Sequence, residues 1–147
     1  MFTMNRQQNL QLANERAARR PQRHGLAASE LAVCLPVVVL LVLATIEACT
    51  MVFLKQSLTV ASYEGVRAAL VQGATAQDVQ TTCNQVLSDR QIDGAIVTVR
   101  PSDIPSLEPG DLVDVTVSAP CGQNSVIPVM FYQGKTLSST ASMMIEF

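Results

Sequence analysis

The chain is short, weakly acidic overall and unevenly charged: 147 residues, enough for one domain or for a small domain with an anchor, carry a formal net charge of −2. Residues 1–25 hold five arginines against one glutamate, whereas the remaining residues hold eleven acidic and five basic side chains. A small basic arm ahead of an acidic body argues against nucleic-acid binding by the body.

Residues 1–25 have little to bury, and we expect them to be a basic cytoplasmic leader. The next stretch is strongly apolar: Leu31–Ile46 holds 16 residues without a charge, which a helix extends over roughly 24 Å. Continued to Leu54, a helix from residue 26 is long enough to cross a hydrocarbon core of about 30 Å. The arginines before this run predict that the N-terminus lies in the cytoplasm and that the chain after the helix lies outside the inner membrane. Membrane lipid is therefore an expected partner of the helix.

Two acids bracket the apolar run. Glu30 and Glu47 are 17 residues apart, or roughly 25 Å along a helix, so one near each interface keeps both out of the bilayer centre. Glu47 has two interpretations, as a solvated headgroup-region carboxylate or as a partner for a cation on another protein. Pro36 either sets the tilt of the helix or allows local melting on packing.

The helical pattern does not stop at the membrane surface. Apolar residues continue at helical spacing up to Gly73, so we expect one transmembrane helix with its extension over residues 26–72, the second half a stalk. Within this helix, Glu64 and Arg67 are spaced for a local ion pair. Alternatively, together with the small residues around Gly65, they indicate a close helix–helix contact.

Residues 73–147 are predicted to form an exported α+β head. Thr75 and Asp78 have the spacing of a helix N-cap, which predicts a short helix over 75–90. Alternating apolar residues predict three strands, over 96–100, 112–118 and 135–146, in an antiparallel sheet. The fold class is therefore membrane-anchored α+β.

Two cysteines lie in this head. In an oxidising compartment Cys83 and Cys121 are expected to join in a disulfide, which closes a loop of roughly 38 residues. The alternative is two unrelated buried thiols.

An enzyme is not expected. The only histidine is His24, so a histidine-based triad in the exported part is excluded. The two head cysteines have no other soft ligand nearby, and the acids from Asp103 to Asp114 do not fit an EF-hand loop. We therefore expect no cofactor, no metal and no small-molecule substrate.

The junction HGLAASEL, with Gly25 before the apolar run and Glu30 five residues on, resembles the processing site of type IV prepilins. More widely, residues 23–70 resemble the TadE-like family of Tad (Flp) pilus pseudopilins. The motifs that carry this likeness are Arg23-x-Gly25, Glu30, Leu35-Pro36, Glu47 and Glu64-Gly65-Val66-Arg67.

The resemblance implies a pilin-like head and cleavage by a prepilin peptidase between Gly25 and Leu26. It also implies that Glu30 aligns the subunit with its neighbour, and it makes Glu47, Glu64 and Arg67 candidates for contacts with other Tad pilus or envelope subunits. The expected function is a TadE-type minor pilin or pseudopilin that assembles an adhesive surface fibre. The alternatives are an anchored exported module that recruits another envelope protein and an accessory subunit of a membrane enzyme.

Overall fold

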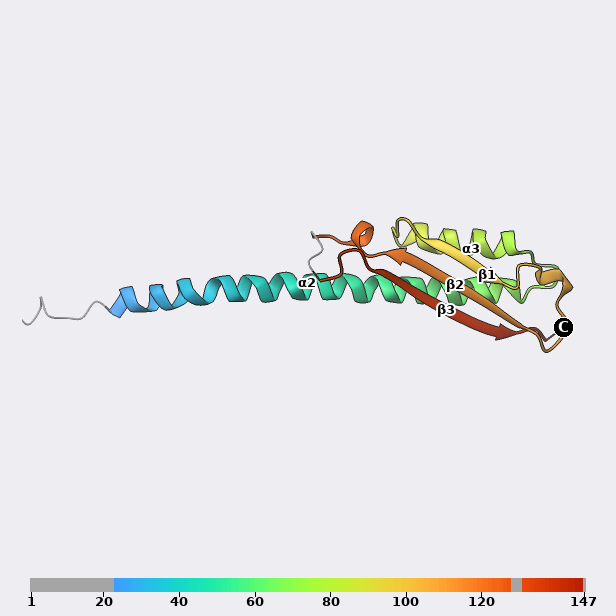
Figure 1. Cartoon of the computed structure of the whole chain (residues 1–147), viewed down its shortest axis with the longest axis horizontal. Coiled ribbons are helices and arrows are strands. Elements are labelled where there is room, and N and C mark those ends of the chain that lie inside the picture. Colours follow the sequence, from blue (N-terminus) through green and yellow to red (C-terminus); the bar gives the residue numbers. More distant parts are fainter. Residues whose placement is uncertain (1–22, 128–130, 147) are drawn as a thin grey trace, which may run out of the picture. The chain divides into compact units, whose positions relative to one another are not determined.

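The computed structural model describes residues 23–127 and 131–146. Its helices and strands, with two short 3-10 turns, follow in the order α2 (Arg23–Ala69), α3 (Ala76–Asp89), β1 (Ile96–Arg100), η1 (Ile104–Ser106), β2 (Leu112–Pro120), η2 (Gly122–Asn124) and β3 (Thr136–Met144) (Figure 1). The expected long helix, short helix and three-stranded antiparallel sheet are therefore confirmed.

The chain divides into two compact units, residues 1–41 and residues 42–147, with α2 contributing to both. In the first unit α2 begins at Arg23, three residues before the predicted start, and continues through Pro36 without ending. In the second unit α2 ends at Ala69, and the chain turns at Gly73, whose φ of +79° lies in the left-handed region that glycine adopts readily.

α3 begins where the sequence predicts it. The Thr75 hydroxyl accepts a hydrogen bond from the Asp78 amide, and the Asp78 carboxylate accepts one from the Thr75 amide at 2.9 Å. These reciprocal bonds form a capping box, which satisfies two amides that the first helical turn leaves unpaired. The Thr75 side chain and amide also hold the pKa of Asp78 below its usual value.

The sheet has the order β1-β2-β3, with both pairs antiparallel. On the central strand the alternating side chains of Val113, Val115 and Val117 are fully buried, as the period-two pattern predicts. The opposite face carries a row of threonines, Thr98, Thr116 and Thr140, paired across the three strands. One face of the sheet therefore belongs to the core and the other is largely polar.

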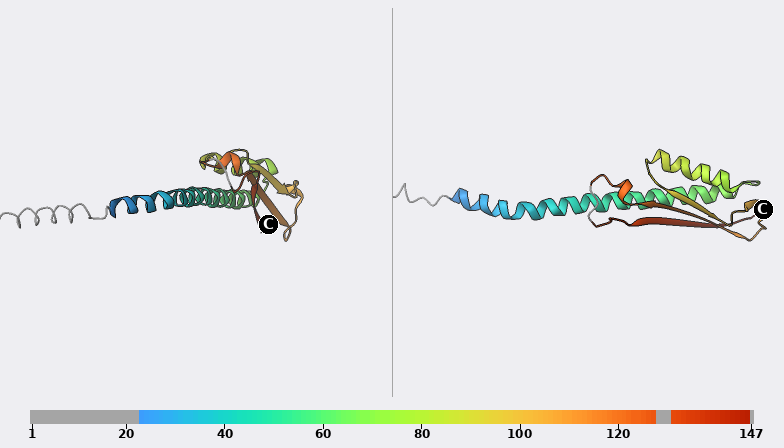
Figure 2. Two further views of the ribbon diagram at one scale, coloured as in Figure 1. Left: turned by 60° about the vertical axis from the view of Figure 1, so that its left-hand side comes forward. Right: turned by 45° about the horizontal axis from the view of Figure 1, so that its top comes forward.

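The core face of the sheet is covered by α2 and α3, which both precede the strands in the chain. α3 lies along the C-terminal part of α2 (Figures 1 and 2). The residues of α2 that are buried in the core recur at helical spacing, and they are Met51, Leu54, Leu58, Ala61, Val66 and Ala69.

This arrangement corrects the predicted domain boundary. The extension of α2 is not a free stalk before a head at residues 73–147, because it is the central helix of that head, whose compact unit starts at Val42. A three-stranded sheet and one short helix have too little apolar surface to form a core alone. The second half of α2 supplies the missing layer.

Gly65 shows how closely the two helices approach. A Cβ atom at this position would overlap the Cys83 sulfur and lie 3.1 Å from a methyl group of Val115. The small-residue stretch around Gly65 thus serves a close helix–helix contact within this chain, between α2 and α3.

Candidate membrane anchor and its junction with the head

The first half of α2 exposes its apolar side chains. Among the described residues, α2 is the one helix long and apolar enough to cross a membrane, with a mean hydropathy of 2.6 over its most apolar window. The side chains of this stretch are exposed from Leu31 through Val42, including Leu40 at 56%. A continuous helical surface of this kind is costly in water and favourable in hydrocarbon. The helix is therefore compatible with a single-pass anchor.

The predicted processing residues lie near the start of this helix. Gly25 and Glu30 are both exposed, and a Cβ atom at Gly25 would have no neighbour within 4 Å. The peptide bond between Gly25 and Leu26 lies inside α2, whose first residue is Arg23. Glu30 lies seven residues, or about two turns, after the first residue of α2, so it is beyond the first turn in which the helix dipole favours a negative charge.

Glu47 is placed quite differently. Its side chain is only 1% exposed, and its Oε1 atom accepts hydrogen bonds from the backbone amides of Phe131 at 2.9 Å and Tyr132 at 3.0 Å. These amides lie in the connection between β2 and β3, 84 and 85 residues further along the chain. Neither expectation for Glu47, a solvated carboxylate or a contact with another subunit, included this intramolecular arrangement.

The chemistry of the Glu47 contact explains why a carboxylate is tolerated there. A buried charge is costly unless it accepts hydrogen bonds, and a charged acceptor makes bonds worth about 1.5–3 kcal/mol. One carboxylate oxygen here fixes two consecutive backbone amides, which ties the start of the Tyr132–Lys135 turn to the helix. Sequence reasoning missed this contact because its only local signal is an acid near the end of an apolar run.

C-terminal to Glu47, two further polar contacts join α2 to β3. The Lys55 ammonium group donates a hydrogen bond to the Ser138 carbonyl oxygen, and the Thr59 and Ser139 hydroxyls are 3.0 Å apart. Lys135 lies over the ring of Tyr132, with its Nζ atom 5.3 Å from the ring centre. The contacts of Glu47, Lys55 and Thr59 thus span 12 residues, or about three turns, of α2.

Glu64 and Arg67 form the local ion pair that their spacing predicts. The Arg67 Nη1 and Glu64 Oε2 atoms are 3.8 Å apart, and both side chains are exposed to solvent. Screening by water leaves such a pair with little effect on folding. Both groups remain accessible from outside.

The predicted Cys83–Cys121 disulfide is absent, and both cysteines are buried free thiols. Cys83 packs between Gly65 and Val115 and donates a hydrogen bond to the Ala61 carbonyl oxygen at 3.3 Å. Cys121 follows the end of β2, six positions beyond Val115, or about 20 Å along an extended strand. A disulfide requires Cα atoms within about 7 Å of each other. Because Cys83 packs beside Val115 and Cys121 lies far along the strand from Val115, the two cysteines are at different ends of the core. Burial raises the pKa of Cys83 to about 11, which keeps this thiol protonated and unreactive.

Two of the acids from Asp103 to Asp114, one at the end of the β1–β2 connection and one in β2, make local hydrogen bonds. The Asp111 carboxylate accepts a hydrogen bond from the Glu108 amide at 3.0 Å, and Asp114 accepts one from the Ser142 hydroxyl across β2 and β3. Within the described ranges, 23–127 and 131–146, no three histidine, cysteine or acidic side chains gather as metal ligands would.

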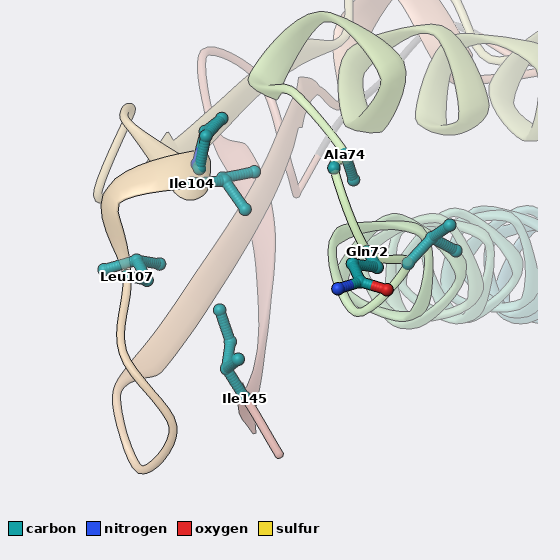
Figure 3. A pocket seen from close by; sticks show the side chains of 8 residues that line it. Gln72, Ala74, Ile104, Leu107 and Ile145 are labelled. Carbon is teal, nitrogen blue, oxygen red and sulfur yellow. The ribbon is translucent and has the colours of Figure 1, made fainter. Parts of the chain in front are cut away.

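In the part of the head that the structure describes, cavities lie at opposite ends. One, of about 210 Å³, lies where α2 ends, between Gln72 and Ala74 on one side and Ile104, Leu107 and Ile145 on the other (Figure 3). The second, of about 300 Å³, lies beside the Glu47 contact and has a mainly apolar wall. Met51, Val52, Lys55, Tyr132 and Leu137 are among the residues that line it.

Comparison with known proteins gives one match. Residues 25–67 match the family model described as TadE-like protein, which confirms the resemblance found in the sequence over this segment. The comparisons with curated proteins and with solved structures gave no significant match. The matched segment starts at the predicted processing glycine and ends at Arg67, so it covers the exposed apolar run, Glu47 and the part of α2 inside the head. The likeness to TadE-like proteins is thus confined to α2.

Proposed function

We propose that this protein is a TadE-type minor pilin or pseudopilin that takes part in assembling a Tad (Flp) pilus for surface adhesion, without a catalytic role. The observation that carries the proposal is the match of residues 25–67 to the TadE-like family. It is supported by the exposed apolar helix that follows Gly25 and Glu30.

In this proposal the leader is removed by a prepilin peptidase between Gly25 and Leu26. α2 then spans the inner membrane with its N-terminus toward the cytoplasm, and the head lies outside. Glu30 near the new N-terminus pairs with the amino group of a neighbouring subunit, because a carboxylate at the bilayer edge is stabilised by a cationic partner.

The cleavage is tested by mass spectrometry of the full chain produced with and without a prepilin peptidase. We expect an N-terminus at Leu26 only when the peptidase is present, and an intact chain for the Gly25→Leu variant. Since no atom lies within 4 Å of a Cβ at Gly25, this substitution leaves the helix undisturbed and reports on recognition. An intact N-terminus in the presence of active peptidase contradicts the proposal.

A second measurement separates a fibre subunit from an anchored recruiting module. The Glu30→Ala variant of a fibre component is expected to be cleaved and membrane-bound but to lose fibre assembly, whereas a module that uses α2 only as an anchor keeps its function. Because Glu30 is exposed, the Glu30→Ala substitution is not expected to disturb folding, so a folding defect would not explain a loss of fibre assembly. Normal piliation by the Glu30→Ala variant contradicts the fibre role.

A further inference from the structure

The exposed surface at the base of the head stays apolar beyond Glu47. From Ile46 to Phe53 the exposed side chains of α2 are uncharged, and the largest of them are Ile46, Val52 and Phe53. Glu47 is the one charged residue between Leu31 and Leu54, and it is withdrawn into the head. Lys55 is therefore the first charged side chain after Glu30 that α2 presents to its surroundings.

The length of this uncharged surface determines where along α2 the bilayer ends. Counted from Leu31, a hydrocarbon core of about 30 Å takes about 20 helical residues and ends near Thr50, about one turn beyond Glu47. The uncharged exposed surface reaches Leu54, about 36 Å from Leu31. The level of Glu47 thus lies at or inside the hydrocarbon boundary, and its intramolecular hydrogen bonds supply the partners that lipid does not offer.

The part of the head that Glu47 holds must lie at that same level. Phe131, whose amide donates a hydrogen bond to Glu47, is 62% exposed, although contact between its apolar ring and water is unfavourable. Its neighbour Tyr132 is half-buried and lines the 300 Å³ cavity with Met51 and Val52. Aromatic side chains with an adjoining cation are typical of the membrane–water interface, and Lys55 and Lys135 stand beside Tyr132.

We propose that the base of the head is immersed in the lipid interface, with Phe131 inserted among the acyl chains and the cavity at Val52 and Tyr132 open to a phospholipid. Lys55 and Lys135 then lie at headgroup level, where ammonium groups are attracted to anionic phosphates. The inference rests on α2 spanning a membrane, which is part of the proposed function, and it is independent of processing and of fibre assembly.

Tryptophan fluorescence tests this directly, because the chain contains no tryptophan. Full-length single-tryptophan variants are reconstituted at low density in phosphatidylethanolamine–phosphatidylglycerol vesicles, with and without acyl-chain-brominated lipid. The reporters are Phe131→Trp and Val52→Trp, both at exposed positions that a larger ring does not disturb. Leu40→Trp is the control within the anchor, and Val71→Trp is the control at the far end of the head, where Val71 is also exposed.

We expect bromolipid to quench Phe131→Trp and Val52→Trp by at least half as much as Leu40→Trp, and to leave Val71→Trp unquenched. Quenching of Leu40→Trp alone overturns the immersed base and leaves the membrane span standing. A blue-shifted but unquenched Phe131→Trp shows that a protein surface, such as a second copy of the chain, covers the ring, and it also overturns the inference. An unquenched Leu40→Trp contradicts both the membrane span and the immersed base.

Discussion

The two halves of α2 are built from similar apolar residues but present them in opposite ways. From Leu31 to Val42 the side chains are exposed around the whole helix, whereas from Met51 to Ala69 only one face is buried, against the sheet and α3. The first half suits a surrounding that is apolar on every side, and the second suits a core on one side and water on the other. One helix without a break thus serves two environments, and the change lies near Glu47.

The same charge placed in each half of α2 should have opposite effects on the head and on the anchor. In Leu58→Asp the carboxylate enters the core at a fully buried position and has no partner, so we expect a loss of about 4 kcal/mol or more and an unfolded head. In Leu40→Asp the head keeps its fold, but insertion of the helix becomes less favourable by about 3 kcal/mol, or about 100-fold.

Protease resistance of the head and carbonate extraction from membranes measure the two effects separately. Leu58→Asp should lose resistance and keep membrane association, and Leu40→Asp should do the reverse. Loss of head resistance in Leu40→Asp would show that the fold of the head needs the first half of α2, which contradicts the division of the helix into two independent halves.

The next largest effect concerns the point where the two halves meet. Glu47→Ala removes the acceptor for two backbone amides, and we expect a loss of about 2–4 kcal/mol in unfolding free energy. Glu47→Gln retains a carbonyl oxygen at the same place and should lose only about 1 kcal/mol. Denaturant unfolding gives these values, and hydrogen exchange at the Phe131 and Tyr132 amides should be fastest in Glu47→Ala.

Glu30→Ala is the matched control for Glu47→Ala, since Glu30 is an exposed glutamate on the same helix. It should leave both the unfolding curve and the exchange of these two amides unchanged. Unaltered exchange at Phe131 and Tyr132 in Glu47→Ala would mean that the carboxylate does not hold this turn.

The contrast between local and distant contacts also explains how much the sequence predicts. The capping box at Thr75 and Asp78, and the alternation of Val113, Val115 and Val117, depend on neighbours in the chain, and both are confirmed. The helix of the anchor follows from composition alone. For these elements local pattern and final packing agree.

What the sequence did not predict depends on residues far apart. The bonds from Glu47 join positions 84 and 85 residues apart, and no local pattern identifies their partners. The disulfide was predicted from cysteine number and compartment, but Cys83 and Cys121 occupy different ends of the core. The stalk was predicted from helical periodicity, which does not say whether the apolar face of a helix meets lipid, water or its own sheet.

The smallest expected effect is at the exposed pair on the second half of α2. Glu64→Ala and Arg67→Ala should each change the unfolding free energy by less than about 0.5 kcal/mol, because water screens an ion pair at 3.8 Å between exposed side chains. Denaturant unfolding of both single variants and of the double variant measures this. A loss above 1 kcal/mol in either would show that the pair is part of the head's stabilising contacts. If folding is unaffected, these variants test the outer face of the second half of α2, which is the half with a polar outer surface. A loss of fibre assembly in Glu64→Ala or Arg67→Ala then indicates a contact of this face with another subunit.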